Sequence, residues 1–160
     1  MAADADREPL SLHDAAEMLL EECRMVLPGV QALFGFQMVV VFSHDFAQRL
    51  GPGEQRVHLV AIAFVIVAAA VLMTPAALQR QTGARQVTRA FLRLSTRLLL
   101  WGMVPLALGT ALDLYLVARV ILGAPAPAAV VAAAVLACIA GLWFALPHAR
   151  RSGHERAAGA

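Results

Sequence analysis

Four long apolar stretches, almost free of charged residues, constrain this chain more than any other feature of its sequence. They cover residues 26–42, 57–78, 98–122 and 128–147. A helix needs about 20 apolar residues to cross the hydrocarbon core of a bilayer, and a charge inside that core is costly. Charged residues make up only 15% of the chain and gather outside these stretches. The sequence therefore predicts an all-α integral membrane protein with four transmembrane helices packed in a bundle.

One amphipathic helix is expected before the first span and another before the third. Ser11 and Asp14 have the spacing of a capping box, which predicts a helix that starts at about Leu12 and leads into the first span. Residues 84–97 place arginine at every fourth position on one face and apolar residues on another. We expect this second helix to continue directly into the third span.

The polar segments divide the rest of the chain. Residues 1–10 are expected to form a disordered tail, residues 11–147 the membrane domain, and residues 148–160 a basic C-terminal tail. Residues 43–56 contain the turn signal Gly-Pro-Gly at 51–53, which predicts a polar loop between the first two spans.

The basic residues are distributed unequally between the two sides of the membrane. All 13 are arginine. Four spans place both termini and the middle loop on one side, which then holds ten arginines, whereas the other side holds three, Arg49, Arg56 and Arg119. Arginine-rich segments that flank spans stay in the cytoplasm. We therefore expect a multi-pass protein of the bacterial inner (plasma) membrane with both termini in the cytoplasm.

Asp113 is the one acidic residue inside a predicted span. It lies about 24 Å along the helix from Arg97, in the outer half of the bilayer. Gln37 and His58 are expected at comparable depths, which predicts a polar cluster of Gln37, His58 and Asp113. One interpretation is a proton- or cation-coupling carboxylate with a histidine partner. The alternatives, which we favour, are a hydrogen bond that locks helices together, or an interfacial carboxylate that reaches Arg119 or outside water.

The first span carries a second glutamine, Gln31. Because both glutamines are polar, we expect Gln31 and Gln37 to face other helices rather than lipid. Their spacing of six positions puts them about 120° apart around the helix, which weakens the case for a continuous polar channel.

An arginine stripe, Arg85, Arg89, Arg93 and Arg97, is the most pronounced charge pattern in the chain. We expect these side chains to contact anionic lipid head groups beside the third span. Pairing with the acidic face of the N-terminal helix is an alternative, and so is a simple role in setting the topology. No nucleic-acid partner is expected.

No grouping of residues in the sequence indicates catalysis. The serines lack the context of a nucleophile, no glycine-rich phosphate loop is present, and the histidines lack metal-ligand spacing. The two cysteines, Cys23 and Cys138, are far apart and predict neither a disulfide framework nor a zinc site. We expect no enzyme activity, no metal and no cofactor.

The fourth span has small residues at intervals of four positions. They are Ala129, Ala133, Ala137 and Gly141. Small residues with this spacing allow helices to approach closely, so the pattern favours a tight contact within the bundle or in a homodimer.

Residues 22–36 (ECRMVLPGVQALFGF), followed by Phe42 and Phe46, resemble a family of small four-span bacterial membrane proteins that is frequent in actinobacteria. The pairs Gln-Arg at 55–56 and Thr-Pro at 74–75 are similar to the pattern of that family. The resemblance covers residues from about 12 to 122 and implies a four-span fold.

That family is one of unknown function, and its members are often labelled sodium:proton antiporters. Gln79 stands where the family pattern has a histidine, so no role of that histidine carries over. The resemblance supplies no catalytic or binding residues.

These observations together favour a non-enzymatic integral membrane protein with a structural, regulatory or accessory role. The alternative is a small cation/proton antiporter that uses Asp113 as its coupling carboxylate. Small multidrug transporters also have four spans, but their essential acid lies in the first span, which has no acid here.

Overall fold

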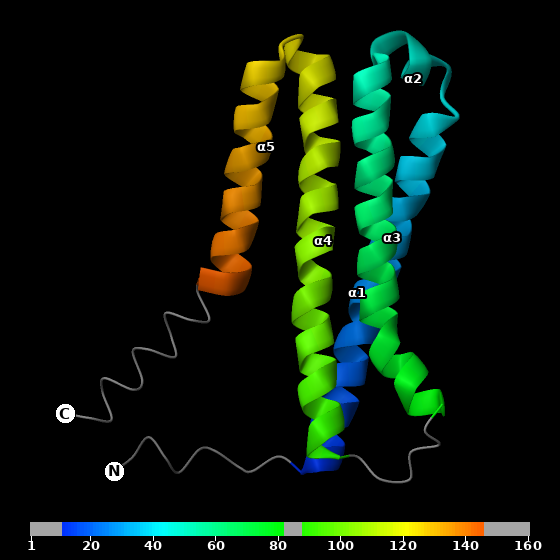
Figure 1. Ribbon diagram of the computed structural model, residues 1–160, viewed down its shortest axis with the longest axis vertical. Coiled ribbons are helices and arrows are strands. Elements are labelled where there is room, and N and C mark those ends of the chain that lie inside the picture. The colour runs from blue at the N-terminus through cyan, green and yellow to red at the C-terminus, as the bar shows by residue number, and fades with distance from the viewer. Residues whose placement is uncertain (1–10, 82–87, 146–160) are drawn as a thin grey trace, which may run out of the picture.

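The computed structural model describes residues 11–81 and 88–145, so the predicted tails, 1–10 and 148–160, lie outside the described part. That part contains five α-helices and one π-helical turn (Figure 1). They are α1 (Leu12–Val41), α2 (His44–Arg49), α3 (Pro52–Gln81), α4 (Arg89–Leu122), α5 (Pro125–Ala140) and η1 (Gly141–Ala145). Four helices are long and apolar enough to cross a membrane, the last of them running from α5 into η1. The predicted all-α, multi-pass fold is confirmed.

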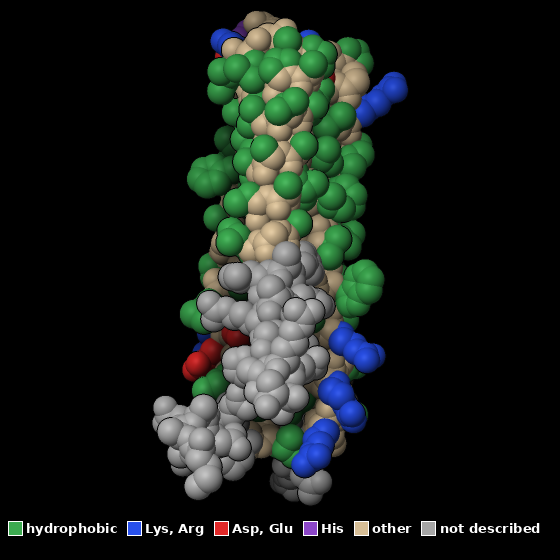
Figure 2. Space-filling view, turned by 90° about the vertical axis from the view of Figure 1, so that its left-hand side faces the viewer, with side chains coloured by type: hydrophobic (Ala, Val, Ile, Leu, Met, Phe, Trp, Pro, Cys, Tyr) green, Lys and Arg blue, Asp and Glu red, His purple; other side chains and the backbone are tan. Residues whose placement is uncertain are grey.

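The long helices α3 and α4 form the centre of the bundle. They pack against each other more extensively than any other pair, while α1 packs on α3 and more lightly on α4. Helix α5 lies on the opposite side of α4, so the four long helices do not form a closed square (Figure 1). Many large apolar side chains are exposed, and they cover much of the face on which α5 lies (Figure 2). Such a surface suits lipid tails, which are as apolar as leucine.

Both predicted amphipathic segments are continuous with the spans that follow them. Ser11 caps α1 by accepting a hydrogen bond from the backbone N–H of Asp14, which confirms the predicted start at Leu12. Thr88 caps α4 in the same way, through the N–H of Phe91. The second helix was expected from residue 84, and residues 84–87 lie outside the described part.

The prediction of a polar loop over residues 43–56 is wrong for most of the segment, because helices occupy residues 44–49 and 52–56. A short helix, α2, occupies part of it, and α3 already begins at Pro52. Proline fits the first turn of a helix because its missing N–H has no helical partner there. The carboxylate of Glu54 accepts a hydrogen bond of 2.9 Å from the N–H of Gly51, which fixes the turn that enters α3.

Two glycines of α4 let this helix approach α3 closely. A Cβ atom on Gly102 would lie 2.9 Å from Cγ of Leu72. On Gly109 it would lie 2.9 Å from Cγ2 of Val65 and 3.1 Å from the backbone oxygen of Ala61. These distances are too short for real atoms. The close approach of α4 to α3 therefore requires glycine, which has no side chain, at both positions.

We predict that Gly109→Ala destabilises the protein, by about 1–3 kcal/mol, because the added methyl group overpacks the contact between α3 and α4. Gly35→Ala is the matched control, since nothing lies within 4 Å of a Cβ at that position. Thermal unfolding of both variants in detergent micelles would measure the difference. Equal melting temperatures for the two variants would contradict the close contact.

Candidate functional site

The structure brings Gln37, His58 and Asp113 together from α1, α3 and α4. The amide nitrogen of Gln37 donates a hydrogen bond of 2.6 Å to Oδ2 of Asp113. Nδ1 of His58 lies 3.4 Å from Oδ1 of Asp113, and its Nε2 lies 3.1 Å from the backbone oxygen of Gln37. Gln37 and His58 are 3% and 5% exposed. Each of the three residues therefore contacts the other two, His58 reaching Gln37 through the backbone.

The hydrogen-bond roles of these atoms fix where protons can lie. A backbone carbonyl only accepts, so Nε2 of His58 must carry a hydrogen that it donates to Gln37. Nδ1 of His58 then faces a carboxyl oxygen, and two bare acceptors would repel each other. We infer that Nδ1 and Oδ1 of Asp113 hold one proton between them. Whichever of the two carries it, the pair has no net charge, which lowers the cost of placing Asp113 among apolar helices.

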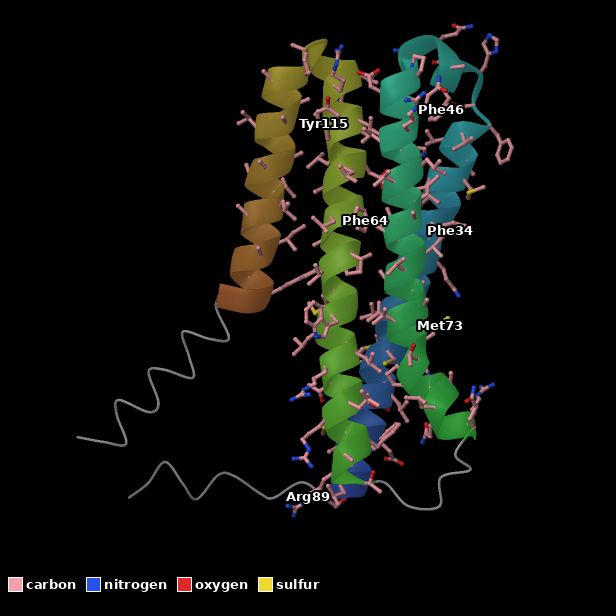
Figure 3. The ribbon with its side chains drawn as sticks, viewed as in Figure 1. Phe34, Phe46, Phe64, Met73, Arg89 and Tyr115 are labelled. Atoms are coloured by element: carbon pink, nitrogen blue, oxygen red, sulfur yellow. The ribbon has the colours of Figure 1, made fainter. Side chains whose placement is uncertain are left out.

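The short helix α2 covers one side of the cluster. The ring of Phe46 packs on the ring of His58, with their centroids 5.4 Å apart. Phe46 is labelled near the end of the bundle where α2 connects α1 to α3 (Figure 3). The histidine ring is therefore held by a hydrogen bond at one nitrogen and by an aromatic contact at its face.

An ion pair closes the bundle above the cluster. Nε of Arg119 lies 3.0 Å from Oε1 of Glu54, so the last turns of α4 are tied to the first turn of α3. Asp113 precedes Arg119 by six positions, which places it about 9 Å further into the bundle. The alternative that Asp113 reaches Arg119 is wrong, because each of the two has a different partner.

A pocket of about 340 Å³ opens beside the cluster. Gln37, His58 and Asp113 form its polar end, and every other lining residue is apolar. Several of the apolar lining residues, such as Phe36 and Ile121, are largely exposed, so the mouth faces the surroundings of the bundle between α1 and α4. The complete lining is Leu33, Phe36, Gln37, Val40, Leu50, His58, Asp113, Leu116, Val117, Val120 and Ile121.

Two acceptor atoms at the polar end are buried without a hydrogen-bond partner among residues 11–81 and 88–145. They are Oε1 of Gln37 and Oδ1 of Asp113. Buried polar atoms are rarely left unpaired, so unpaired acceptors beside a pocket indicate where a donor from outside the chain can bind.

The pocket, the stacking of Phe46 and the ion pair of Glu54 were not predicted. Glu54 stands four positions before His58, which puts both residues on the same face of a helix. This spacing could have predicted that Glu54 lies near the cluster, but the segment was interpreted as a loop. The prediction that Gln31 faces another helix is wrong, since its side chain is exposed, whereas that of Gln37 is buried.

The arginine stripe lies on the first turns of α4. Arg89, Arg93 and Arg97 are exposed, and basic side chains form a column along the lower part of the molecule (Figure 2). Arg89 marks the lower end of α4 (Figure 3). Arg85 lies outside the described residues. Pairing of this stripe with the acidic face of α1 stays a prediction.

The small residues that recur every four positions in α5 face away from the rest of the bundle. Ala129, Ala133 and Ala137 are exposed, whereas Ala128 and Ala132 are buried. Among residues 11–81 and 88–145, the first set makes no tight contact with another helix, and a homodimer through this face stays a prediction.

We predict that Gln37→Leu lowers the free energy of unfolding by about 1–3 kcal/mol, because it removes the hydrogen bond that the buried Asp113 accepts. Gln31→Leu is the matched control on the same helix, and we expect it to be neutral because Gln31 is exposed. Chemical or thermal unfolding in micelles would measure both. Similar losses for the two variants would show that the cluster does not hold α1 to α4.

Comparison with known proteins places the chain in a family. The chain matches no curated protein and no solved structure. The model of one family, DUF6328, matches residues 12–147, which is most of the chain and extends beyond the expected range of 12–122. The expected relation to a family of unknown function is confirmed. Four of its helices are long and apolar enough to span a membrane. Because the match covers most of its length, the chain belongs to DUF6328, a family of unknown function.

Proposed function

We propose that this chain is a non-enzymatic protein of the bacterial plasma membrane that binds a lipophilic molecule in an accessory or regulatory role. The observation that carries the proposal is the pocket between α1 and α4, with apolar walls and one polar end at Asp113. Ligand pockets typically combine an apolar lining with a few polar groups that fix orientation, and the volume is at the lower end of their range of about 300–1,000 Å³.

The position of the mouth supports entry from the bilayer. Exposed side chains of α1 and α4 flank it, including Phe36 and Val117, and these surfaces belong to the apolar exterior that lipid covers. Helices α1 and α4 are also the least closely packed pair among α1, α3 and α4. A lipophilic molecule dissolved in the membrane would reach the cluster without crossing water.

The lining residues favour binding over catalysis. The pocket wall has no serine, threonine or cysteine among the residues described, so no hydroxyl or thiol nucleophile faces a ligand there. His58 is engaged at both ring nitrogens. The polar end is suited to recognise a head group.

The antiporter alternative gains no support from the family match or from the pocket. A cation that moves through a membrane protein needs polar groups to replace its hydration shell. Between the mouth and Asp113, the described lining is apolar. We therefore assign Asp113 to ligand recognition.

We predict that Val117→Trp, which fills the pocket, removes a bound lipophilic molecule from the purified protein. Val131→Trp is the matched control, because Val131 is exposed on α5, away from the pocket. Protein extracted from its native membrane with mild detergent would be analysed by mass spectrometry for co-purifying small molecules. The proposal fails if no molecule is depleted in Val117→Trp relative to Val131→Trp.

The orientation that we propose places both termini and the arginine stripe in the cytoplasm. The positions from Arg97 to Arg119 extend for about 33 Å in α4, close to the thickness of about 30 Å of a hydrocarbon core. Arg97 would then lie at the cytoplasmic boundary, where exposed arginines contact anionic lipid head groups. The cluster and its pocket would lie in the outer leaflet.

We predict that alkaline phosphatase fused after residue 160 is inactive in a bacterial host, because the enzyme folds only in an oxidising compartment such as the periplasm. A fusion in the segment between α1 and α3 is the positive control. Colony colour with a chromogenic phosphate ester reports the outcome. An active C-terminal fusion would reverse the proposed orientation.

A further inference from the structure

At the polar end of the pocket two acceptor atoms have no hydrogen-bond partner, whereas both nitrogens that carry hydrogen, Nε2 of Gln37 and Nε2 of His58, already donate. The amide of Gln37 donates to Asp113, and Nε2–H of His58 donates to the backbone of Gln37. Oε1 of Gln37 has no hydrogen-bond partner in the described chain, and Oδ1 of Asp113 has only the long contact of 3.4 Å with Nδ1 of His58. A quinone or an ester, which only accepts hydrogen bonds, would add further acceptors to this site. A head group that fits must therefore donate.

Charge narrows the choice of donor. Asp113 and His58 together are neutral while they hold one proton between Oδ1 and Nδ1. If that proton leaves, a carboxylate beside a neutral imidazole remains, and the site carries one negative charge. An ammonium group would neutralise this charge and donate a charge-assisted hydrogen bond to the carboxylate. An alcohol would also donate a hydrogen bond, but it would leave the negative charge of the carboxylate uncompensated.

We infer that the pocket takes an amphipathic primary amine in its ammonium form, and that the ammonium displaces the proton shared by Asp113 and His58. The inference rests on the proposed function of the pocket. The exchange is balanced: one ammonium binds, one proton passes to water, and the net charge of the occupied site stays zero. The alkyl part of the amine lies along the apolar wall formed by α1 and α4, where the pocket opens.

Other charged groups around the cluster are paired or distant. At the rim, Glu54 of α3 and Arg119 of α4 pair with each other. On α2, Asp45 and Arg49 pair with each other. Nearer the cluster these elements also carry His44, which contacts Gln48, the exposed Arg56 and the half-buried Tyr115. The other titratable groups lie toward the far ends of α3 and α4, and they are Arg80, Arg89, Arg93 and Arg97.

Helix α1 faces the cluster with the uncharged Gln37. Its described charged residues end at Arg24, which is 13 positions, or about 20 Å, from Gln37. The change of charge on binding therefore falls on Asp113 and His58.

The test compares two probes of equal chain length, decylamine and decanol, on the full chain in phosphatidylcholine nanodiscs. Isothermal titration at pH 7 is done in phosphate and in Tris, two buffers with different ionisation heats, and the signal of empty nanodiscs is subtracted. The dependence of the heat on the buffer gives the number of protons released. We expect one proton per decylamine and none for decanol. The affinity for decylamine should be about tenfold higher or more, as one charge-assisted hydrogen bond provides.

Asp113→Asn keeps an acceptor for Gln37 but removes the negative charge. We expect it to lose the preference for decylamine and the proton release, and to bind decanol as before. Val117→Trp should weaken the binding of both probes. The comparison of the two probes on the unmodified protein needs no variant, so it stands even where Asp113→Asn does not fold.

Saturable binding of both probes with equal affinity, or binding of decylamine without proton release, overturns the amine assignment and leaves the proposed pocket intact. Absence of saturable binding of either probe overturns this inference. If, in addition, no molecule is depleted from the extracted Val117→Trp protein, the proposed function falls as well.

Discussion

A carboxyl group among apolar helices must find its partners within the protein, because lipid offers none. This constraint organises the half of the bundle that lies near α2. Asp113 takes a hydrogen bond from Gln37 of α1 and lies 3.4 Å from the imidazole of His58 on α3. Helix α1 packs more lightly on its neighbours than α3 and α4 pack on each other. The polar contacts therefore add to the apolar contact of Val30 with Val65 and Leu72 in fixing its position.

The centre of the bundle is held by contacts of a different kind. Gly102 and Gly109 allow α4 to lie so close to α3 that a methyl group at either position would collide with its neighbours. In lipid, where apolar burial gives little drive for helix association, such close van der Waals packing becomes a main source of stability. The rigid pair of α3 and α4 then presents His58 and Asp113 to α1. The pocket forms where α1 and α4 diverge beside this cluster.

The sequence predicted features that depend on position along a helix. Apolar length identified the spans, Ser11 marked the start of α1, and counting residues along the spans brought Gln37, His58 and Asp113 to one depth. Features that depend on rotation about the helix axis were not predicted. Gln31 and Gln37 are equally polar, and only the packing of α1 on α3 and α4 decides which one is buried. The pocket could not be predicted, because it is a space between helices that no single helix encodes.

Helix α5 packs almost wholly on α4 and contributes no residue to the pocket lining described above. Every residue of the cluster, of the pocket wall and of the ion pair above it precedes Gly123 in the chain. The order of synthesis therefore affects when the site can assemble. While the ribosome is still translating the last helix, the three helices that carry the cluster have already been made. The site can thus assemble co-translationally, before α5 packs against the remaining face of α4.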